Sequence, residues 1–286
     1  MNLLVGYTAD QRGAEAIELA AALVQGISSP TLVIAIVLPA SAPFNAIYPG
    51  GDHGFDSILS AKVDEWAAHA LNQVPTGISA RVVARSVPSV AEGLMELAGE
   101  VGAQGIVLGG RKRHRAGFFM PGTVANALLH ASHVSVIMSS PQALASLRAA
   151  QGKITRMTAF VGDRPGAREV IANAAKFATT RGVGLRVATL VADTDVSDPA
   201  TELNQHLVLT RKFLTELTDS MGLQATVEVV SGQSLDSAIE SLEWIDGELA
   251  ILGSARLAAT RRLFIGPKAQ RILRQLNVPM AVVPNK

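Results

Sequence analysis

Short apolar runs alternate with longer amphipathic stretches along the chain. In the first half the apolar runs cover residues 2–7, 31–38, 80–86, 105–109 and 134–138, and the amphipathic stretches cover 13–25, 56–71, 89–101 and 122–131. Continuous apolar runs of this length are typical of strands buried on both faces, and the amphipathic stretches have the period of helices. The pattern therefore predicts a parallel sheet with helices on both faces.

The second half repeats this pattern. Predicted strands cover 156–161, 185–191, 225–230, 249–253 and 279–284, and predicted helices cover 166–180, 201–221, 235–245 and 267–276. A shift of 144 residues aligns Ile106–Gly109 with Ala250–Gly253 and Gly122 with Gly266 without a gap. The sequence thus predicts an α/β protein made of two tandem doubly wound domains, each with a five-stranded parallel sheet.

The predicted domains are residues 1–140 and 152–286, joined by a helical or irregular linker at 141–151. We call them the first and second repeat. The first repeat has an additional Pro- and Gly-rich segment at 39–55, after its second strand. This segment would lie near any ligand at that strand's end, as a lid or simply as a long loop.

Composition narrows the class of protein. The chain has 286 residues, a net charge of +1, 48% hydrophobic residues and no cysteine. The near-neutral charge argues against a general nucleic-acid binder, and the lack of cysteine excludes disulfides and thiolate catalysis. No signal peptide or membrane span of roughly 20 apolar residues is evident, so we expect a cytoplasmic protein that is not bound to membranes.

Ligands of open parallel α/β sheets bind at the carboxyl ends of the strands. In the first repeat the fourth strand leads into the basic run Arg111–Arg115, and Gly122-Thr123 then begins a helix. Free N–H groups at a helix start and flanking cations favour phosphate, while Gly109 and Gly110 allow close approach of the backbone. The alternative interpretation of the basic run is a solvent-exposed loop that binds no ligand.

These residues resemble a known family. The pattern Gly-x2-Gly-x9-Gly-(Ser/Thr) marks the nucleotide-binding members of the universal stress protein family, and the tandem organisation resembles its two-domain members. The resemblance implies an adenine nucleotide alpha hydrolase-like fold with strand order 3-2-1-4-5. It also implies that the two last strands, Val134–Met138 and Val278–Val283, pair with each other, so that the two domains associate within the chain. A homodimer is left open.

The motif is altered in both repeats. In the first, Gly109, Gly122 and Thr123 match, but Lys112 replaces the second glycine, and Thr8-Ala9-Asp10 stands where the family has Asp-Gly-Ser. In the second, Arg256 replaces that glycine and Pro267 replaces the Ser/Thr. Because proline lacks a backbone donor, we expect nucleotide in the first repeat and weak or no binding in the second.

The leading hypothesis is a non-catalytic stress-response regulator that binds ATP or another adenine nucleotide, with or without Mg²⁺, while slow ATP hydrolysis stays open. By resemblance, the ribose and adenine would lie near Thr8, Ala9, Ile36 and Val37. The phosphates would lie near Gly109, Gly110, Arg111, Lys112, Arg113, Gly122 and Thr123. The alternative is an interaction or scaffold protein of the same family that binds no nucleotide.

A phosphate-ester enzyme is the third hypothesis and the weakest, because no set of nucleophile, base and orienting group is recognisable. We predict no catalytic residue. We also predict no metal site, since His130 and His133 lack a third ligand. Trp66 and Trp244 are expected in the core.

Overall fold

A computed structural model of the chain describes residues 1–40, 52–110, 121–139, 141–162, 166–197, 199–254 and 263–284. The Pro- and Gly-rich segment, apart from its ends, and the basic run Arg111–Arg115 lie outside these residues. The chain forms two compact units, residues 1–109 and 110–286. The predicted domain limits stay a prediction, because they refer to the sequence repeats rather than to these units.

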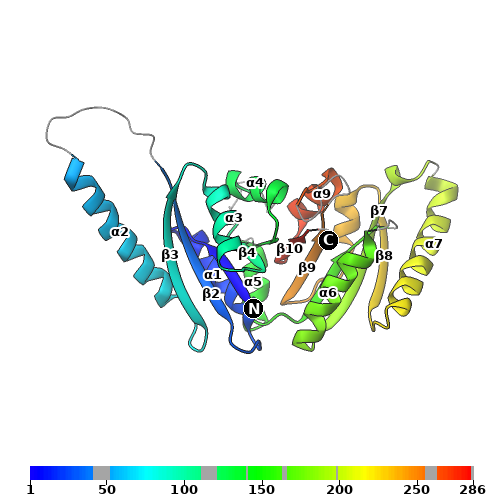
Figure 1. The fold of residues 1–286 in the computed structure, drawn as a ribbon. Helices are drawn as coiled ribbons and strands as arrows, with labels where there is room; N and C mark the ends of the chain where they lie inside the picture. Colours follow the sequence, from blue (N-terminus) through cyan, green and yellow to red (C-terminus); the bar gives the residue numbers. More distant parts are fainter. Residues whose placement is uncertain are drawn as a thin grey trace. The chain divides into compact units, whose positions relative to one another are not determined.

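The first unit contains four parallel strands and three helices of the first repeat. Its elements are β1 (Asn2–Gly6), α1 (Gln11–Val24), β2 (Thr31–Pro39), α2 (Asp52–Asn72), β3 (Ser79–Val87), α3 (Val90–Glu100) and β4 (Gly105–Leu108). The strand order is β3-β2-β1-β4. The connection from β1 to β2 and the connection from β3 to β4 cross the sheet in opposite directions. Because such connections are right-handed, α1 and α3 lie on opposite faces of the sheet (Figure 1).

The second unit contains the remaining elements. They are α4 (Thr123–Ala131), β5 (Ser135–Met138), α5 (Pro141–Ala149), β6 (Arg156–Phe160), α6 (Ala167–Arg181), β7 (Gly184–Ala192), the 3₁₀ helix η1 (Asp193–Asp195), α7 (Pro199–Ser220), β8 (Thr226–Gly232), α8 (Leu235–Glu240), β9 (Glu248–Gly253), α9 (Pro267–Gln275) and β10 (Met280–Val283). The strand order is β5-β10-β9-β6-β7-β8. Strands β6 to β10 therefore follow the order 3-2-1-4-5. The predicted α/β class and its tandem, largely parallel sheets are confirmed.

The last strands of the two repeats pair antiparallel with each other in the second unit. Met280 lies opposite Met138, and Val282 lies opposite Val136. This is the pairing that the resemblance implies, and it leaves neither β5 nor β10 with an open edge on that side.

The apolar runs form the cores of the two units because strands covered on both faces have no side exposed to water. Leu3, Leu4 and Val5 of β1 are fully buried, as are Ala250 and Ile251 of β9. In the described part of the chain, no helix is both long enough and apolar enough to span a membrane.

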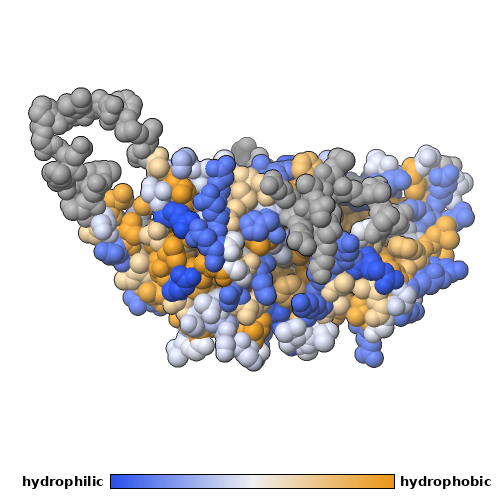
Figure 2. Space-filling view, in the orientation of Figure 1, coloured by the Kyte–Doolittle hydropathy of each residue, from blue (hydrophilic) through white to orange (hydrophobic). Residues whose placement is uncertain are grey.

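Two sequence predictions differ from the structure. The helix predicted at 235–245 ends at Glu240, because arginine side chains bind the backbone at Glu243. Trp66 and Trp244 are only half-buried, and are not core residues. Val208 of α7 is 60% exposed and Leu209 is 57% exposed, and hydrophobic surface is visible at the right of Figure 2, where Figure 1 places α7.

Candidate functional site

Some of the predicted site residues lie together at the carboxyl ends of three neighbouring strands of the first unit. They are Thr8 and Ala9 after β1, Ile36 and Val37 in the last part of β2, and Gly109 after β4. The strands are parallel and β1 lies between β2 and β4, so these ends share one edge of the sheet. Thr8 and Ala9 are exposed there.

The two candidates in β2 differ in accessibility. Ile36 is 3% exposed and belongs to the core. Val37 is half-buried, and its Cγ1 atom lies close to Gly93 of α3, where a Cβ would be 3.1 Å away. Of the two, Val37 is the one with surface left to contact a ligand.

Asp10 organises the turn between β1 and α1. Its carboxylate accepts hydrogen bonds from the Arg12 backbone N–H at 3.0 Å and from the Thr8 hydroxyl at 2.7 Å, and so caps the helix. The Arg12 guanidinium lies 2.6 Å from the same carboxylate. Partial burial raises the pKa of Asp10, but the hydrogen bonds from Arg12 and Thr8 outweigh it and hold this pKa below the ordinary value. The carboxylate is therefore ionised near neutral pH.

Gly109 is explained by packing inside the unit. A Cβ at this position would lie 2.0 Å from the Arg12 carbonyl oxygen, so only glycine lets the start of α1 approach the end of β4. The aligned Gly253 faces a side chain instead, because its Cβ would lie 2.4 Å from Val170 Cγ2. The sequence suggested close approach of a ligand, whereas the structure shows close approach of a helix.

The other predicted phosphate-binding residues belong to the second unit or are not described. Gly110, Gly122 and Thr123 lie in the second unit, and Arg111, Lys112 and Arg113 lie outside the described residues. Gly122 is the N-cap of α4, and no side chain accepts a hydrogen bond at that cap. Among the described residues no side chain caps this first turn, so its backbone N–H groups are suited to donate to an anion.

The corresponding helix start in the second repeat differs in its first two residues. Pro267 occupies the first turn of α9, and the neighbouring Lys268 Nζ lies 2.8 Å from Asp195 Oδ2. Ser254, which follows β9, accepts a hydrogen bond from the Phe264 N–H at 2.8 Å. Compared with α4, this end lacks one donor and already has a cation paired with a carboxylate.

Sequence reasoning missed a contact between the edge of the candidate site and α2. The Tyr7 hydroxyl lies 2.9 Å from His69 Nδ1, which is 62 residues away in the sequence. Tyr7 directly precedes Thr8 and is 5% exposed. No local signal could have found this pair. The capping pattern of Asp10 before α1, by contrast, is readable from sequence.

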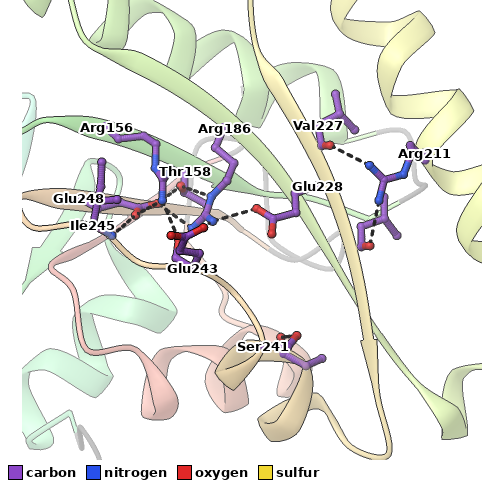
Figure 3. Close-up of polar contacts among 12 residues, drawn as sticks. Arg156, Thr158, Arg186, Arg211, Val227, Glu228, Ser241, Glu243, Ile245 and Glu248 are labelled. Carbon is purple, nitrogen blue, oxygen red and sulfur yellow. Dashed lines mark hydrogen bonds and ion pairs between the residues drawn. The ribbon is translucent and has the colours of Figure 1, made fainter.

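A cluster of charged residues lies at the amino ends of the strands in the second repeat (Figure 3). Arg186, 1% exposed, donates to Glu248 at 2.8 Å and to Glu228 at 2.9 Å. Arg156 donates to the other Glu248 oxygen at 2.6 Å, and Thr158 also donates to Glu248. Because the arginines are matched by glutamates and hydrogen-bonded, the buried charges are compensated.

The same arginines hold the segment that follows α8. Both Arg156 and Arg186 donate to the Glu243 carbonyl oxygen, at 2.8 and 2.9 Å. The Arg186 guanidinium carbon lies 5.1 Å from the centre of the Trp244 ring. The cluster is thus a structural network at the amino ends of the strands of the second repeat, whereas ligands of such sheets bind at the carboxyl ends. In the described residues, no group of three or more His, Asp or Glu side chains could hold a metal ion.

Comparisons with known proteins agree on one family. The sequence profile of the universal stress protein family matches residues 1–140 and 153–284. Universal stress proteins of Mycobacterium tuberculosis and Mycobacterium bovis are 25% identical over 299 residues, which cover 99% of this chain and 100% of each relative.

Solved structures show the same fold. A universal stress protein from Archaeoglobus fulgidus has a TM-score of 0.67 at 16% identity, with 100% of this chain and 98% of that chain covered. A functionally unknown protein from Pseudomonas aeruginosa PAO1 has a TM-score of 0.60 at 16% identity, with 99% and 92% covered.

Proposed function

Because the chain belongs to the universal stress protein family, we propose that it is a non-catalytic stress-response regulator that binds ATP, or another adenine nucleotide, in its first repeat. The observation that carries this proposal is the difference between the two helix starts. Neither N-cap, Gly122 of α4 or Gly266 of α9, has a side-chain hydrogen bond, but α9 begins with Pro267, which has no N–H group, and its Lys268 is paired with Asp195. Free N–H donors at a helix start are suited to phosphate.

The proposed contacts follow from the positions of the candidate residues. Thr8 and Ala9 would contact the ribose, and Val37, rather than the buried Ile36, would contact adenine. Gly109, Gly110, Arg111, Lys112, Arg113, Gly122 and Thr123 would hold the phosphates. Mg²⁺, if it accompanies ATP, would neutralise phosphate charge, and its oxygen ligands would come mainly from phosphate and water.

The first test is to purify the protein without added nucleotide, denature it, and identify released small molecules by chromatography and mass spectrometry. We expect close to one ATP or ADP per chain. Titration calorimetry of the emptied protein should give one site rather than two, because the helix start in the second repeat lacks the donor that Pro267 replaces and its Lys268 is already paired.

A double variant tests the phosphate contacts. Arg111→Ala with Lys112→Ala should weaken ATP binding at least about tenfold, since each lost charge-assisted hydrogen bond contributes more than about 1 kcal/mol. Arg256→Ala at the aligned position of the second repeat is the matched control and should leave the affinity unchanged. Equal losses in both variants would contradict the assignment to the first repeat.

An interaction or scaffold function without nucleotide is the second candidate, and one observation favours it. The segment before α9 is bound to α4, because the Leu263 N–H donates to the Ser132 carbonyl at 2.8 Å and the Ile265 N–H donates to the Leu129 carbonyl at 3.1 Å. In the second repeat this part of the motif makes contacts within the protein. A protein that is purified empty and shows no thermal shift with about millimolar ATP would support this candidate and overturn the first.

A further inference from the structure

Tyr7 is fixed between the candidate site and the core of the first unit. It follows β1 directly, its N–H donates to the Ala35 carbonyl at 2.9 Å, and its side chain is 5% exposed. Its ring lies against α1 at Gly13, where a Cβ would come within 2.7 Å of the ring and 2.0 Å of the Thr8 carbonyl oxygen. The positions of the Tyr7 ring and of the Thr8 backbone are therefore set together by the same helix.

The Tyr7 hydroxyl is bonded to α2. It lies 2.9 Å from His69 Nδ1, and Gln73 Nε2 lies 3.0 Å from the same nitrogen. His69 is in the last turn of α2 and Gln73 directly follows that helix. A hydrogen bond thus joins the residue next to Thr8 and Ala9 to a helix that is distant in sequence.

Few side chains are buried in the part of α2 whose side chains the structure describes. From Leu59 to Asn72, the part of α2 whose side chains are described, Ala70 is the only fully buried residue. The corresponding helix of the second repeat, α7, buries Thr210, Leu214 and Thr218. Among the described residues, α2 thus buries fewer side chains than α7.

Helix α7 is attached in a different way. Its Arg211 donates to the Val227 and Val229 carbonyl oxygens of the edge strand β8, at 3.3 and 3.4 Å (Figure 3). The residue aligned with Tyr7 in the second repeat is Val161, which has no hydroxyl group. The link between a strand end at the site and the outer helix is thus particular to the first repeat.

We propose that Tyr7 is a positioning residue that couples occupancy of the nucleotide site to the docking of α2. The inference rests on the proposed function. A nucleotide that contacts Thr8 and Ala9 restricts the backbone beside Tyr7, and so favours the position in which its hydroxyl bonds to His69. A ligand shifts a conformational equilibrium only through such differential contacts. Binding therefore orders α2, and α2 becomes the surface that differs between the free and the bound protein.

The test combines hydrogen exchange with calorimetry on the full chain. Saturating ATP should slow exchange of the amides in residues 63–72 about fivefold, the effect expected when one hydrogen bond of ordinary net strength is populated more fully. Peptides from α7 are the internal control and should not change. Tyr7→Phe keeps the ring against Gly13 and should bind ATP within about twofold of the wild type, but the ATP-dependent protection of α2 should be lost.

A conservative control separates coupling from general loosening of the helix. Gln73→Ala removes the other contact of His69 Nδ1 and keeps the Tyr7 hydroxyl, so protection by ATP should persist. Trp66 provides a second readout, because in a Trp244→Phe background it is the only tryptophan and lies on α2. Its emission should respond to ATP only while Tyr7 is present.

Two kinds of result would overturn the proposal, and they are distinguishable. If calorimetry shows ATP binding but α2 exchange is unchanged, or if Tyr7→Phe keeps the protection, the coupling is wrong while the proposed function stands. If calorimetry shows no binding, the proposed function fails and the coupling fails with it.

Discussion

The two repeats share a strand order but differ in the chemistry at the amino ends of their strands. In the second repeat Thr158 of β6 lies beside Arg186 of β7, Glu228 of β8 lies beside Ala188, and Glu248 begins β9. Alignment of the strand registers places Leu4, Val33, Val83 and Gln104 at these positions in the first repeat. The amino ends of the strands thus carry three apolar residues and an exposed glutamine in the first repeat, and a buried ion network in the second.

The comparison shows that the network is not needed for the strand order, because the first repeat reaches that order without it. The clearest local difference lies after the third helix of each repeat. Helix α3 continues to Glu100, whereas α8 ends at Glu240, four residues short of the aligned end at Trp244. In the second repeat the arginines bind the Glu243 carbonyl oxygen, which replaces helical hydrogen bonding there. We infer that the network holds this non-helical segment in place.

The largest expected effect is that of Glu248→Ala. The change leaves Arg186 at 1% exposure without its buried carboxylate, and removal of one partner of a buried ion pair typically costs about 3–5 kcal/mol. The free energy of unfolding from urea denaturation should fall by about that amount. Gln104→Ala, at the aligned position of the first repeat, should change it by less than about 0.5 kcal/mol because Gln104 is exposed.

A double variant sharpens this result by giving the second repeat the residues of the first. Arg186→Val with Glu248→Gln removes both buried charges, so it should be less destabilised than Glu248→Ala alone by about 2 kcal/mol or more. If the double variant instead loses the sum of the single effects, the view that the cost comes from an unpaired buried charge is wrong.

Features that depend on local sequence patterns were predictable, whereas contacts between residues distant in the sequence were not. Strands such as Leu3–Val5 were predictable because burial on both faces leaves a continuous apolar run, and the tandem organisation was predictable from the 144-residue shift. The helix predicted through residue 245 was wrong beyond Glu240, because its end depends on arginines from β6 and β7. Contacts such as Tyr7–His69 and Arg186–Glu248 arise from strand order and register, which periodicity does not specify.

A further prediction, with a smaller expected effect, compares the aligned glycines Gly109 after β4 and Gly253 in β9. At Gly109 an added Cβ meets the Arg12 backbone carbonyl, which cannot move without shifting α1, so Gly109→Ala should cost about 3 kcal/mol. At Gly253 it meets only a methyl group of Val170, so Gly253→Ala should cost about 1 kcal/mol. Urea midpoints of the two variants give the comparison. Equal costs would mean that the two helix-to-strand contacts are equivalent after all.

The smallest expected effect concerns the ion pair between Asp195, which follows β7, and Lys268 in the first turn of α9. Partial burial raises the pKa of Asp195, but hydrogen bonds from Lys268 and the Ala192 N–H outweigh it and hold this pKa below the ordinary value of 3.8. A carboxyl group with a lowered folded-state pKa stabilises the protein above its unfolded-state pKa, and this contribution is lost as the pH falls through the lower folded-state value. Both side chains are more than a third exposed, so the contribution is below about 1 kcal/mol.

Asp195→Asn should therefore lower the thermal midpoint slightly near neutral pH, and the difference from the wild type should close as the pH falls below the ordinary pKa of 3.8 and through the lower folded-state pKa. Added salt should reduce it as well, because an exposed pair is screened. Lys268→Ala should show the same pH dependence, since it removes the other partner of the pair. A difference that stays constant down to about pH 3 would mean that Asp195 acts through the backbone hydrogen bond from Ala192, which asparagine preserves in part, rather than through its charge. The second repeat would then close its helix start by chain geometry and Pro267, with no electrostatic contribution from the Asp195–Lys268 pair.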